Sequence, residues 1–421
     1  MTEASLQSLS PTQRPKIKES FTHIDFPKIG VSHFFKEEDF LIGAWLLTIV
    51  AKVAARKGKT NNETWQIMAN PIDELKSYRE VVDHFKQARR KINLLLGNGF
   101  SIAYDRGIFS YNALSRFIMD SDNETIKRVF QVYNNQNFES IMQQLNNMVD
   151  VLKILEAPNG LCDKVTSLSA DLKAKLIDAI SAMHPEQVFT VDEAKSKHCA
   201  DFLREYIYNE GHIFSTDYDL LLYWVLLRNG VENFVDGFGR EAENVEEGVY
   251  TPKEDTEWSE LIWGKYKSSQ NVHYLHGALP LFDEGKDIIK VEYDGSNYLL
   301  DVIKKKIENG SYPVFVAAGN SNEKMQHISH NKYLQYCYDS LCHITGSLVV
   351  LGFSFGENDT HIIDAINEAA WHGHKGSPYD KLVSVYVGVF SEDDYKHMQS
   401  IKKKFQVKME CFDARTAHIW E

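Results

Sequence analysis

An apolar run that stops at two closely spaced glycines sets the strongest limit on the fold. Residues 91–96 read Lys-Ile-Asn-Leu-Leu-Leu and lead directly into Gly97-Asn98-Gly99, with Ser101 two positions later. Such a run is typical of a buried parallel strand that ends in a tight turn. Glycine accepts backbone conformations closed to other residues, so the turn can approach a ligand closely. If a helix follows, its free N–H groups point at a phosphate.

The segment therefore predicts a nucleotide-binding turn after the first strand of a sheet. The alternative is a tight strand–loop turn without a ligand. It stays open because the full dinucleotide fingerprint has a third glycine nearby, and Gly-x-Gly is only part of that fingerprint.

Further short strand candidates follow the first one and alternate with helical segments. The strand candidates are residues 212–215, 272–275, 314–317, 347–351, 383–387 and 407–411. The helical segments are 219–228, 298–308, 331–344, 359–371 and 391–405. This alternation predicts an α/β fold, a Rossmann-like and mostly parallel sheet with helices on both faces.

Two other regions depart from this alternation. Apolar side chains recur at helical spacing across residues 111–209, which predicts a large helical insertion at about 111–210. Residues 1–90 read as a polar arm followed by helices, so the sheet domain is expected to span 91–421. Residues 241–260 are acidic and polar, and predict a surface loop.

Charge and cysteine content narrow the class of protein. The chain has 46 basic and 59 acidic side chains, a net charge of −13, so we expect no direct binding of duplex DNA by the whole surface. A local basic groove stays compatible with this charge. None of the five cysteines forms a C-x-x-C pair, so neither a zinc ribbon nor a disulfide framework is expected. No secretion signal or bilayer-length apolar run is visible, and we expect a cytoplasmic protein.

Polar and small residues gather immediately after four of the strand candidates. In an open parallel sheet, ligands bind at the carboxyl ends of the strands, so these residues are candidates for one site. They are Gly97, Asn98, Gly99 and Ser101; Thr216, Asp217, Tyr218 and Asp219; His276 and Gly277; and Gly352, Ser354 and Gly356.

Three of these residues carry titratable groups suited to catalysis. His276 ends an apolar strand beside a glycine, and a neutral imidazole accepts a proton near pH 7. The alternative is a core histidine bonded to a carbonyl. Asp219 either caps the helix that begins near it or hydrogen-bonds a ligand, and Asp217 has the same two interpretations.

Other patterns point less strongly to chemistry. Residues 352–356 form a Gly-x-Ser-x-Gly string between a strand and a helix, which is also typical of a serine-hydrolase nucleophile turn around Ser354. A triad histidine should follow it, and none of the later histidines has an obvious strand-end setting. The pairs His327 with His330 and His372 with His374 are interpreted as surface residues rather than metal ligands.

Five short motifs, in order, resemble those of sirtuins. Sirtuins carry a Gly-Ala-Gly-x-Ser loop, Gly-Ile-Pro-Asp-Phe, Gln-Asn-Ile-Asp, a His-Gly pair and a late Gly-x-Ser strand end. The corresponding segments are Gly97-Asn98-Gly99-Phe100-Ser101, Gly107-Ile108-Phe109-Ser110-Tyr111, Thr216-Asp217-Tyr218-Asp219, Leu275-His276-Gly277 and Leu351-Gly352-Phe353-Ser354. The chain is most similar to the bacterial sirtuin-like NADases of antiphage defence, of the abortive-infection and HerA-associated types. Residues 352–359, followed by His361-Ile362, resemble their final strand–helix junction.

The resemblance implies a function, a substrate and a set of roles. It implies an NAD⁺ glycohydrolase that depletes NAD, with His276 as base and Asp217 and Asp219 stabilising the transition state. The loop of Gly97, Asn98, Gly99 and Ser101 would hold the pyrophosphate, and Tyr218 and Gly352 would line the NAD pocket. Ser354 and Glu357 would contact the adenosine ribose or line its pocket. Two departures are visible: the sirtuin zinc module is missing, and Asp217 replaces an asparagine.

The resemblance also implies partners and leaves alternatives. It implies a homo-oligomer, with the N-terminal helices as interface, and a HerA-type ATPase partner. One alternative is a nucleotide-sensing interaction module without turnover. The other is a sirtuin-type deacylase or ADP-ribosyl transferase, which the missing zinc module disfavours.

Overall fold

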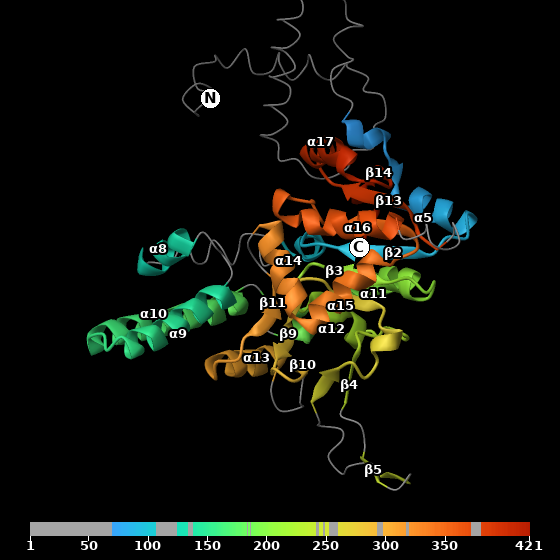
Figure 1. The fold of residues 1–421 in the computed structure, drawn as a ribbon. Coiled ribbons are helices and arrows are strands. Elements are labelled where there is room, and N and C mark those ends of the chain that lie inside the picture. The colour runs from blue at the N-terminus through green and yellow to red at the C-terminus, as the bar shows by residue number, and fades with distance from the viewer. Residues whose placement is uncertain are drawn as a thin grey trace, which may run out of the picture. The chain divides into compact units, whose positions relative to one another are not determined.

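A computed structural model describes most of the chain after residue 69 (Figure 1). The described residues are 70–106, 124–133, 138–182, 184–185, 187–240, 244–246, 249–251, 260–292, 298–316, 320–371 and 380–421. They all belong to one compact unit, Asn70–Glu421. The expected arm and helices before residue 70, the motif at 107–111 and the histidines at 372 and 374 lie outside the described residues.

Seven strands form a parallel sheet, which confirms the predicted α/β, Rossmann-like fold. Their order is β1-β14-β13-β12-β2-β3-β8, and every neighbouring pair is parallel. The strands are β1 (Lys76–Ser77), β2 (Ile92–Leu96), β3 (Ile213–Ser215), β8 (Val272–Tyr274), β12 (Gly346–Leu351), β13 (Leu382–Val389) and β14 (Lys408–Asp413). All residues of β2 and β12 are buried, as expected of central strands covered on both faces.

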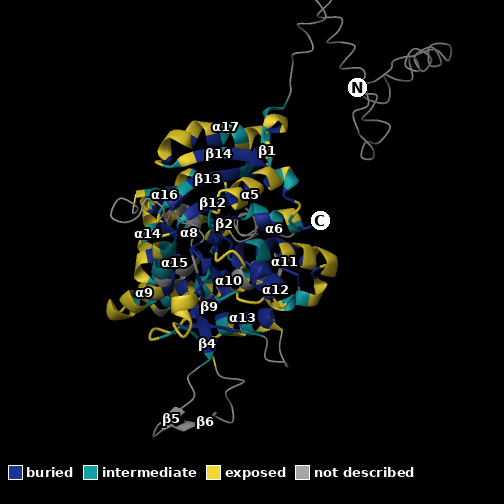
Figure 2. Ribbon diagram, turned by 90° about the vertical axis from the view of Figure 1, so that its right-hand side faces the viewer, coloured by how far each residue is buried: buried dark blue, intermediate teal, exposed yellow. Residues whose placement is uncertain are grey.

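Helices cover both faces of this sheet (Figure 2). One layer contains α5 (Tyr78–Gln87), α6 (Gly99–Tyr104), α11 (Glu193–Ile207) and α12 (Leu221–Arg228). The other contains α14 (Ser321–His330), α15 (Lys332–Cys342), α16 (Thr360–Trp371) and α17 (Glu392–Ile401). Right-handed crossovers explain the two layers, because the chain moves from β2 towards β8 on one side and from β12 towards β14 on the other. The strand order therefore reverses between β2 and β12.

The predicted helical insertion is confirmed between β2 and β3. It contains α8 (Glu124–Tyr133), α9 (Phe138–Ile154) and α10 (Asn159–Ala182), and α11 completes it. α9 and α10 pack along each other beside the sheet domain (Figure 1). None of the described helices combines the length and the apolarity that crossing a bilayer requires.

A second, antiparallel sheet was not predicted. Its order is β11-β9-β10-β7-β4, with β4 (Phe238–Arg240), β7 (Leu261–Trp263), β9 (Gly277–Asp283), β10 (Ile288–Lys290) and β11 (Pro313–Phe315). The strand expected at 314–317 in the parallel sheet is β11, which pairs antiparallel with β9. The loop expected at 241–260 contains the hairpin of β5 (Asn244–Glu246) and β6 (Val249–Thr251). Most of these strands have three residues, too few for a period of two to register in the sequence.

The expected domain boundary at residue 90 is also corrected. β1 pairs with β14, and α5 packs against β14 and presents Val81, Val82 and Phe85 to the core. Ser77 and Glu80 form a capping box that starts α5. Residues 70–90 therefore belong to the sheet domain.

The remaining elements are short. α13 (Leu299–Glu308) precedes β11, and the described 3₁₀ turns are Pro71–Glu74, Val188–Thr190, Lys267–Ser269, Glu357–Asp359, Lys402–Lys404 and Ala414–Thr416.

Candidate functional site

The four strand ends singled out in the sequence are neighbours in the sheet. β12, β2, β3 and β8 are consecutive, so the loops after their carboxyl ends lie side by side. Backbone hydrogen bonds join these loops: Gly99 N–H donates to the Gly352 carbonyl at 2.9 Å, and Leu279 N–H donates to the Tyr218 carbonyl at 2.8 Å. His276 follows β8, which lies two strand spacings, or about 10 Å, from β2. An extended dinucleotide can span that separation.

An acidic pair lies at the end of β3. Ser101 lies in α6, which directly follows β2, and its Oγ donates to Asp217 Oδ2 at 3.3 Å. Both side chains are buried. Burial raises the pKa of the Asp217 carboxyl well above its ordinary value, and the nearby Asp219 carboxylate adds to the rise. Asp217 therefore holds its proton to higher pH than an exposed aspartate does.

Asp219 is a helix cap as well as a member of this pair. Its Oδ1 accepts from the Leu221 N–H at 2.8 Å, at the start of α12. Burial raises the pKa of Asp219 to about 6, even though hydrogen bonds from Ser101 and the Leu221 amide favour its charged form. Two carboxyl groups with separated pKa values thus stand next to each other, an arrangement suited to acid–base and electrostatic roles.

His276 is buried and faces a second histidine. Its Nε2 lies 2.9 Å from Nε2 of His361, on α16. Burial lowers the pKa of His276 well below its ordinary value, and His361 and Lys324 add to the effect. Burial likewise lowers the pKa of His361 to about 4. Both imidazoles are therefore neutral at physiological pH.

Sequence reasoning missed the groups that surround this histidine pair. Ser321 Oγ lies 3.2 Å from His361 Nδ1 and also accepts from the His361 backbone N–H at 2.8 Å. Lys324 Nζ donates to Asp359 Oδ1 at 2.6 Å, and both side chains are more than nine-tenths buried. The strand-end rule did not find them because Ser321 and Lys324 lie on α14, which was not predicted as a helix.

The glycine turn has a different use from the expected one. The Gly99 N–H binds the Gly352 carbonyl and the Phe100 N–H binds the Gly97 carbonyl, so neither amide is available to a phosphate. A Cβ at Gly97 or Gly99 would stand 2.7 Å or less from backbone atoms of the β12 loop. These glycines therefore permit the loops after β2 and β12 to pack against each other. The buried Trp420 also contacts this segment, because its Nε1 donates to the Phe100 carbonyl at 3.0 Å.

The remaining predicted residues line the same edge of the sheet. Asn98 is half-buried, and its Nδ2 is a buried donor without a hydrogen-bond acceptor among the described residues. Tyr218 is half-buried, whereas Gly352, Ser354 and Glu357 are exposed. No hydrogen bond joins Ser354 to a histidine in the described part of the chain, so the geometry gives no support to a serine-hydrolase triad.

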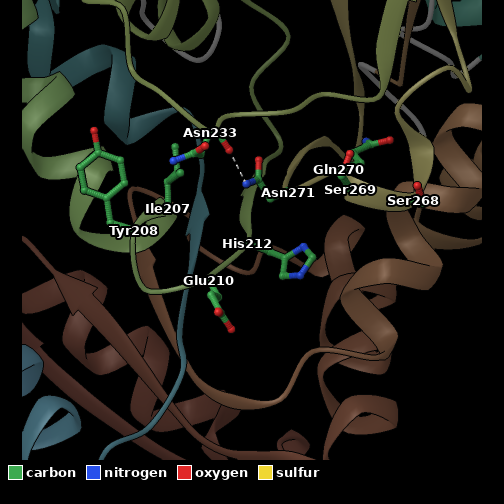
Figure 3. Close-up of a pocket in the computed structure, with 9 residues that line it drawn as sticks. All are labelled: Ile207, Tyr208, Glu210, His212, Asn233, Ser268, Ser269, Gln270 and Asn271. Carbon is green, nitrogen blue, oxygen red and sulfur yellow. Dashed lines mark hydrogen bonds between the residues drawn. The ribbon is translucent and has the colours of Figure 1, made fainter.

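A surface cavity of about 610 Å³ lies at the opposite edge of the sheet (Figure 3). His212 and Asn271, which line it, precede β3 and β8, so the cavity faces the amino ends of these strands. Asn271 Nδ2 donates to the Asn233 carbonyl at 2.8 Å across its rim. We call the residues after the carboxyl ends of β12, β2, β3 and β8 the strand-end site. None of the strand-end residues predicted from the sequence lines this cavity.

Comparison with known proteins assigns the chain to a family. No curated protein matches the chain. The family model described as a domain of unknown function, DUF4917, matches residues 94–420, from within β2 to Trp420. Since the match covers more than half of its length, the chain belongs to the DUF4917 family.

Proposed function

We propose that this protein hydrolyses the nicotinamide–ribose bond of NAD⁺ to give nicotinamide and ADP-ribose. The observation that carries the proposal is the convergence of the Ser101–Asp217–Asp219 cluster and His276 on the carboxyl edge of neighbouring parallel strands. This edge lies next to the point where the strand order reverses, where open α/β sheets bind their ligands.

The acidic pair suits a reaction that develops positive charge on the ribose. With a pKa of about 6, Asp219 is mostly ionised near neutral pH, while Asp217 keeps its proton to higher pH. A carboxylate held in a buried setting stabilises an oxocarbenium-like transition state without reorganising during the reaction. The nicotinamide leaves with the electrons of the broken C–N bond and is neutral, so the leaving group needs no acid.

His276 is assigned the role of base through its second ring nitrogen, and its lowered pKa means that it passes the proton on to solvent rather than holding it. If His361 Nδ1–H donates a hydrogen bond to Ser321 Oγ, His361 Nε2 is left as an acceptor for the Nε2–H of His276. In this assignment of tautomers, the free lone pair of His276 is on Nδ1. Water adds its oxygen to the ribose C1′, and its proton passes to His276 Nδ1 and then to solvent.

Substrate positioning is assigned to the loops of β2 and β12. The unpaired Asn98 Nδ2 is a donor for a phosphate or ribose oxygen, because a buried donor without a partner is costly unless a ligand satisfies it. Ser354 and Glu357 are exposed at the β12 loop and are assigned to the adenosine ribose on the resemblance to sirtuin-like NADases.

The test is nicotinamide release from NAD⁺ by the full-length chain. His276→Gln is expected to lower turnover at least about 100-fold, the usual contribution of a general base. The matched control is His273→Gln, which alters another buried histidine with a lowered pKa on the same β8 segment. His273 contacts His212 rather than the acidic pair, so turnover should persist. Equal turnover in the wild type and His276→Gln would remove His276 from the mechanism.

A nucleotide-binding module without turnover is the second candidate. The burial of Ser101, Asp217 and Asp219 favours it, since a closed site retains a ligand more readily than it exchanges one. Calorimetric binding of NAD⁺ without nicotinamide release would select this function. A role in antiphage defence, with a HerA-type ATPase, is proposed on the resemblance alone. Protection of cells by a His276→Gln variant as strong as that by the wild type would contradict an NAD-depleting defence.

A further inference from the structure

Three buried side chains of types that can bind a metal ion converge at His276. They are His276 after β8, Asp359 in the 3₁₀ turn before α16, and His361 on α16. One ligand atom from each lies within 4.8 Å of the other two. Among the residues that the structure describes, no other set of three histidine, cysteine, aspartate or glutamate side chains meets this spacing.

The geometry is close to that of a tetrahedral metal site. Bonds of about 2.0–2.2 Å set the ligand atoms of tetrahedral zinc roughly 3.3–3.5 Å apart. The facing Nε2 atoms of His276 and His361 are 2.9 Å apart, so they need to separate by only about half an ångström. The carboxylate oxygen needs to approach by about 1.5 Å at most, since the cluster spans 4.8 Å.

A hydrogen bond to Ser321 orients the His361 ring in the way that is usual for histidines that bind metal ions. Ser321 Oγ lies 3.2 Å from Nδ1 of His361 and fixes the ring from the side opposite to Nε2. A ligating histidine commonly donates its other N–H to such an oxygen, which sets the tautomer and aims the ligand nitrogen.

Lys324 acts against a bound cation. Its ammonium lies 2.6 Å from Asp359 Oδ1 and already neutralises that carboxylate. A metal ion must compete with this ammonium for Asp359, so its affinity is limited by Lys324. Removal of the Lys324 charge should therefore tighten metal binding, a prediction that a merely structural histidine pair does not make.

We propose that His276, His361 and Asp359 bind a divalent transition-metal ion of the zinc type. Two imidazole nitrogens and one carboxylate are a donor set that suits Zn²⁺ and Co²⁺. This proposal goes beyond the hydrolase function and stands without it.

Metal binding has a consequence for the base, and that consequence rests on the proposed function. Coordination requires the lone pair of His276 Nε2, so the proton on that nitrogen moves to Nδ1. Nδ1 is the nitrogen that the proposed mechanism uses to accept a proton from water. An occupied metal site would therefore inhibit NAD⁺ hydrolysis.

The test is titration of the metal-free, full-length chain with Zn²⁺ by calorimetry, and with Co²⁺ by visible absorption, both without NAD⁺. We expect one site per chain, and for Co²⁺ the intense visible bands of a tetrahedral ion. His361→Gln should weaken binding at least tenfold. Lys324→Met should increase the affinity for the metal ion at least tenfold. The melting temperature of this variant should rise when Zn²⁺ is added.

His273→Gln is the matched control. His273 and His212 form another close histidine pair, 3.0 Å apart, but no described carboxylate completes a cluster with them. This variant should bind Zn²⁺ as the wild type does. A site that survives His361→Gln unchanged, or the absence of a site in both the wild type and Lys324→Met, would overturn the proposal. Because NAD⁺ is absent from the titration, failure of the hydrolase function does not affect its result.

Discussion

Ser101 Oγ lies 3.3 Å from Asp217 Oδ2, although 116 positions separate the two residues in the chain. The contact joins α6, which follows β2, to the loop after β3, and it brings a hydroxyl to a pair of buried carboxyl groups. It exists because the helical insertion leaves the sheet after β2 and returns to it at the adjacent strand. The acidic pair is therefore a property of neighbouring strands rather than of a continuous motif.

The buried Asp217 carboxyl should lower stability as the pH rises. Its pKa is raised in the folded state, so its contribution to stability is present below the unfolded pKa of about 4 and is lost at higher pH. Asp217→Asn removes this titration. We therefore compare the free energy of unfolding of the Asp217→Asn variant with that of the wild type by urea denaturation. The difference, variant minus wild type, should rise by about 1 kcal/mol or more between pH 4.5 and 7.5.

The matched control for this measurement is Asp150→Asn on α9, where the side chain is exposed. It should show no comparable dependence on pH. A difference between Asp217→Asn and the wild type that is constant with pH would contradict a raised pKa at Asp217.

The buried histidines should destabilise the fold in acid. Burial lowers the pKa of His273 well below its ordinary value and the pKa of His212 to about 4. Their contribution is present above the unfolded pKa of about 6.5 and is lost as the pH falls towards 4. His273→Gln should reduce the loss of unfolding free energy between pH 6.5 and 4.5 by about 1 kcal/mol. An unchanged acid slope would show that His273 is not held neutral.

Gly352 should tolerate no side chain. Its φ is +70°, and a Cβ would stand 2.5 Å from the Phe100 nitrogen. Gly352→Ala should therefore lower the free energy of unfolding by clearly more than the roughly 1 kcal/mol that a positive φ alone costs a non-glycine residue. Gly230→Ala is the matched control, since Gly230 has a φ of +52° and nothing within 4 Å of its Cβ position. Equal losses of melting temperature in the two variants would contradict the close packing of the β2 and β12 loops.

The buried ion pair of Lys290 and Asp236 should be strongly coupled. Lys290 Nζ lies 2.5 Å from Asp236 Oδ2, over the rings of Tyr223 and Phe238. Asp236→Asn leaves a buried ammonium uncompensated and should cost about 3–5 kcal/mol of unfolding free energy. The double variant Asp236→Asn with Lys290→Met should recover much of that loss. Additive effects of the two substitutions in denaturant titrations would argue against the pair.

The sequence predicted the parallel sheet because central strands are buried on both faces. The apolar runs of β2 and β12 are therefore continuous and end at glycines that are visible in the sequence. The long periodic helices of the insertion were equally visible. The antiparallel sheet escaped, because three-residue strands such as β7 and β10 carry no readable period.

What the sequence determined by itself was local: which segments become strands, and which polar side chains stand at strand ends, among them Asp217, Asp219 and His276. Only the tertiary structure decided their partners. His361 lies 85 positions from His276 in the chain. The two meet in a fold where α15 contacts both β8 and α16. Only the structure likewise shows that Gly97 and Gly99 pack against the loop after β12. Sequence spacing encodes backbone conformation, whereas contacts between distant segments depend on strand order and on the face each helix covers, and these are settled only when the sheet assembles.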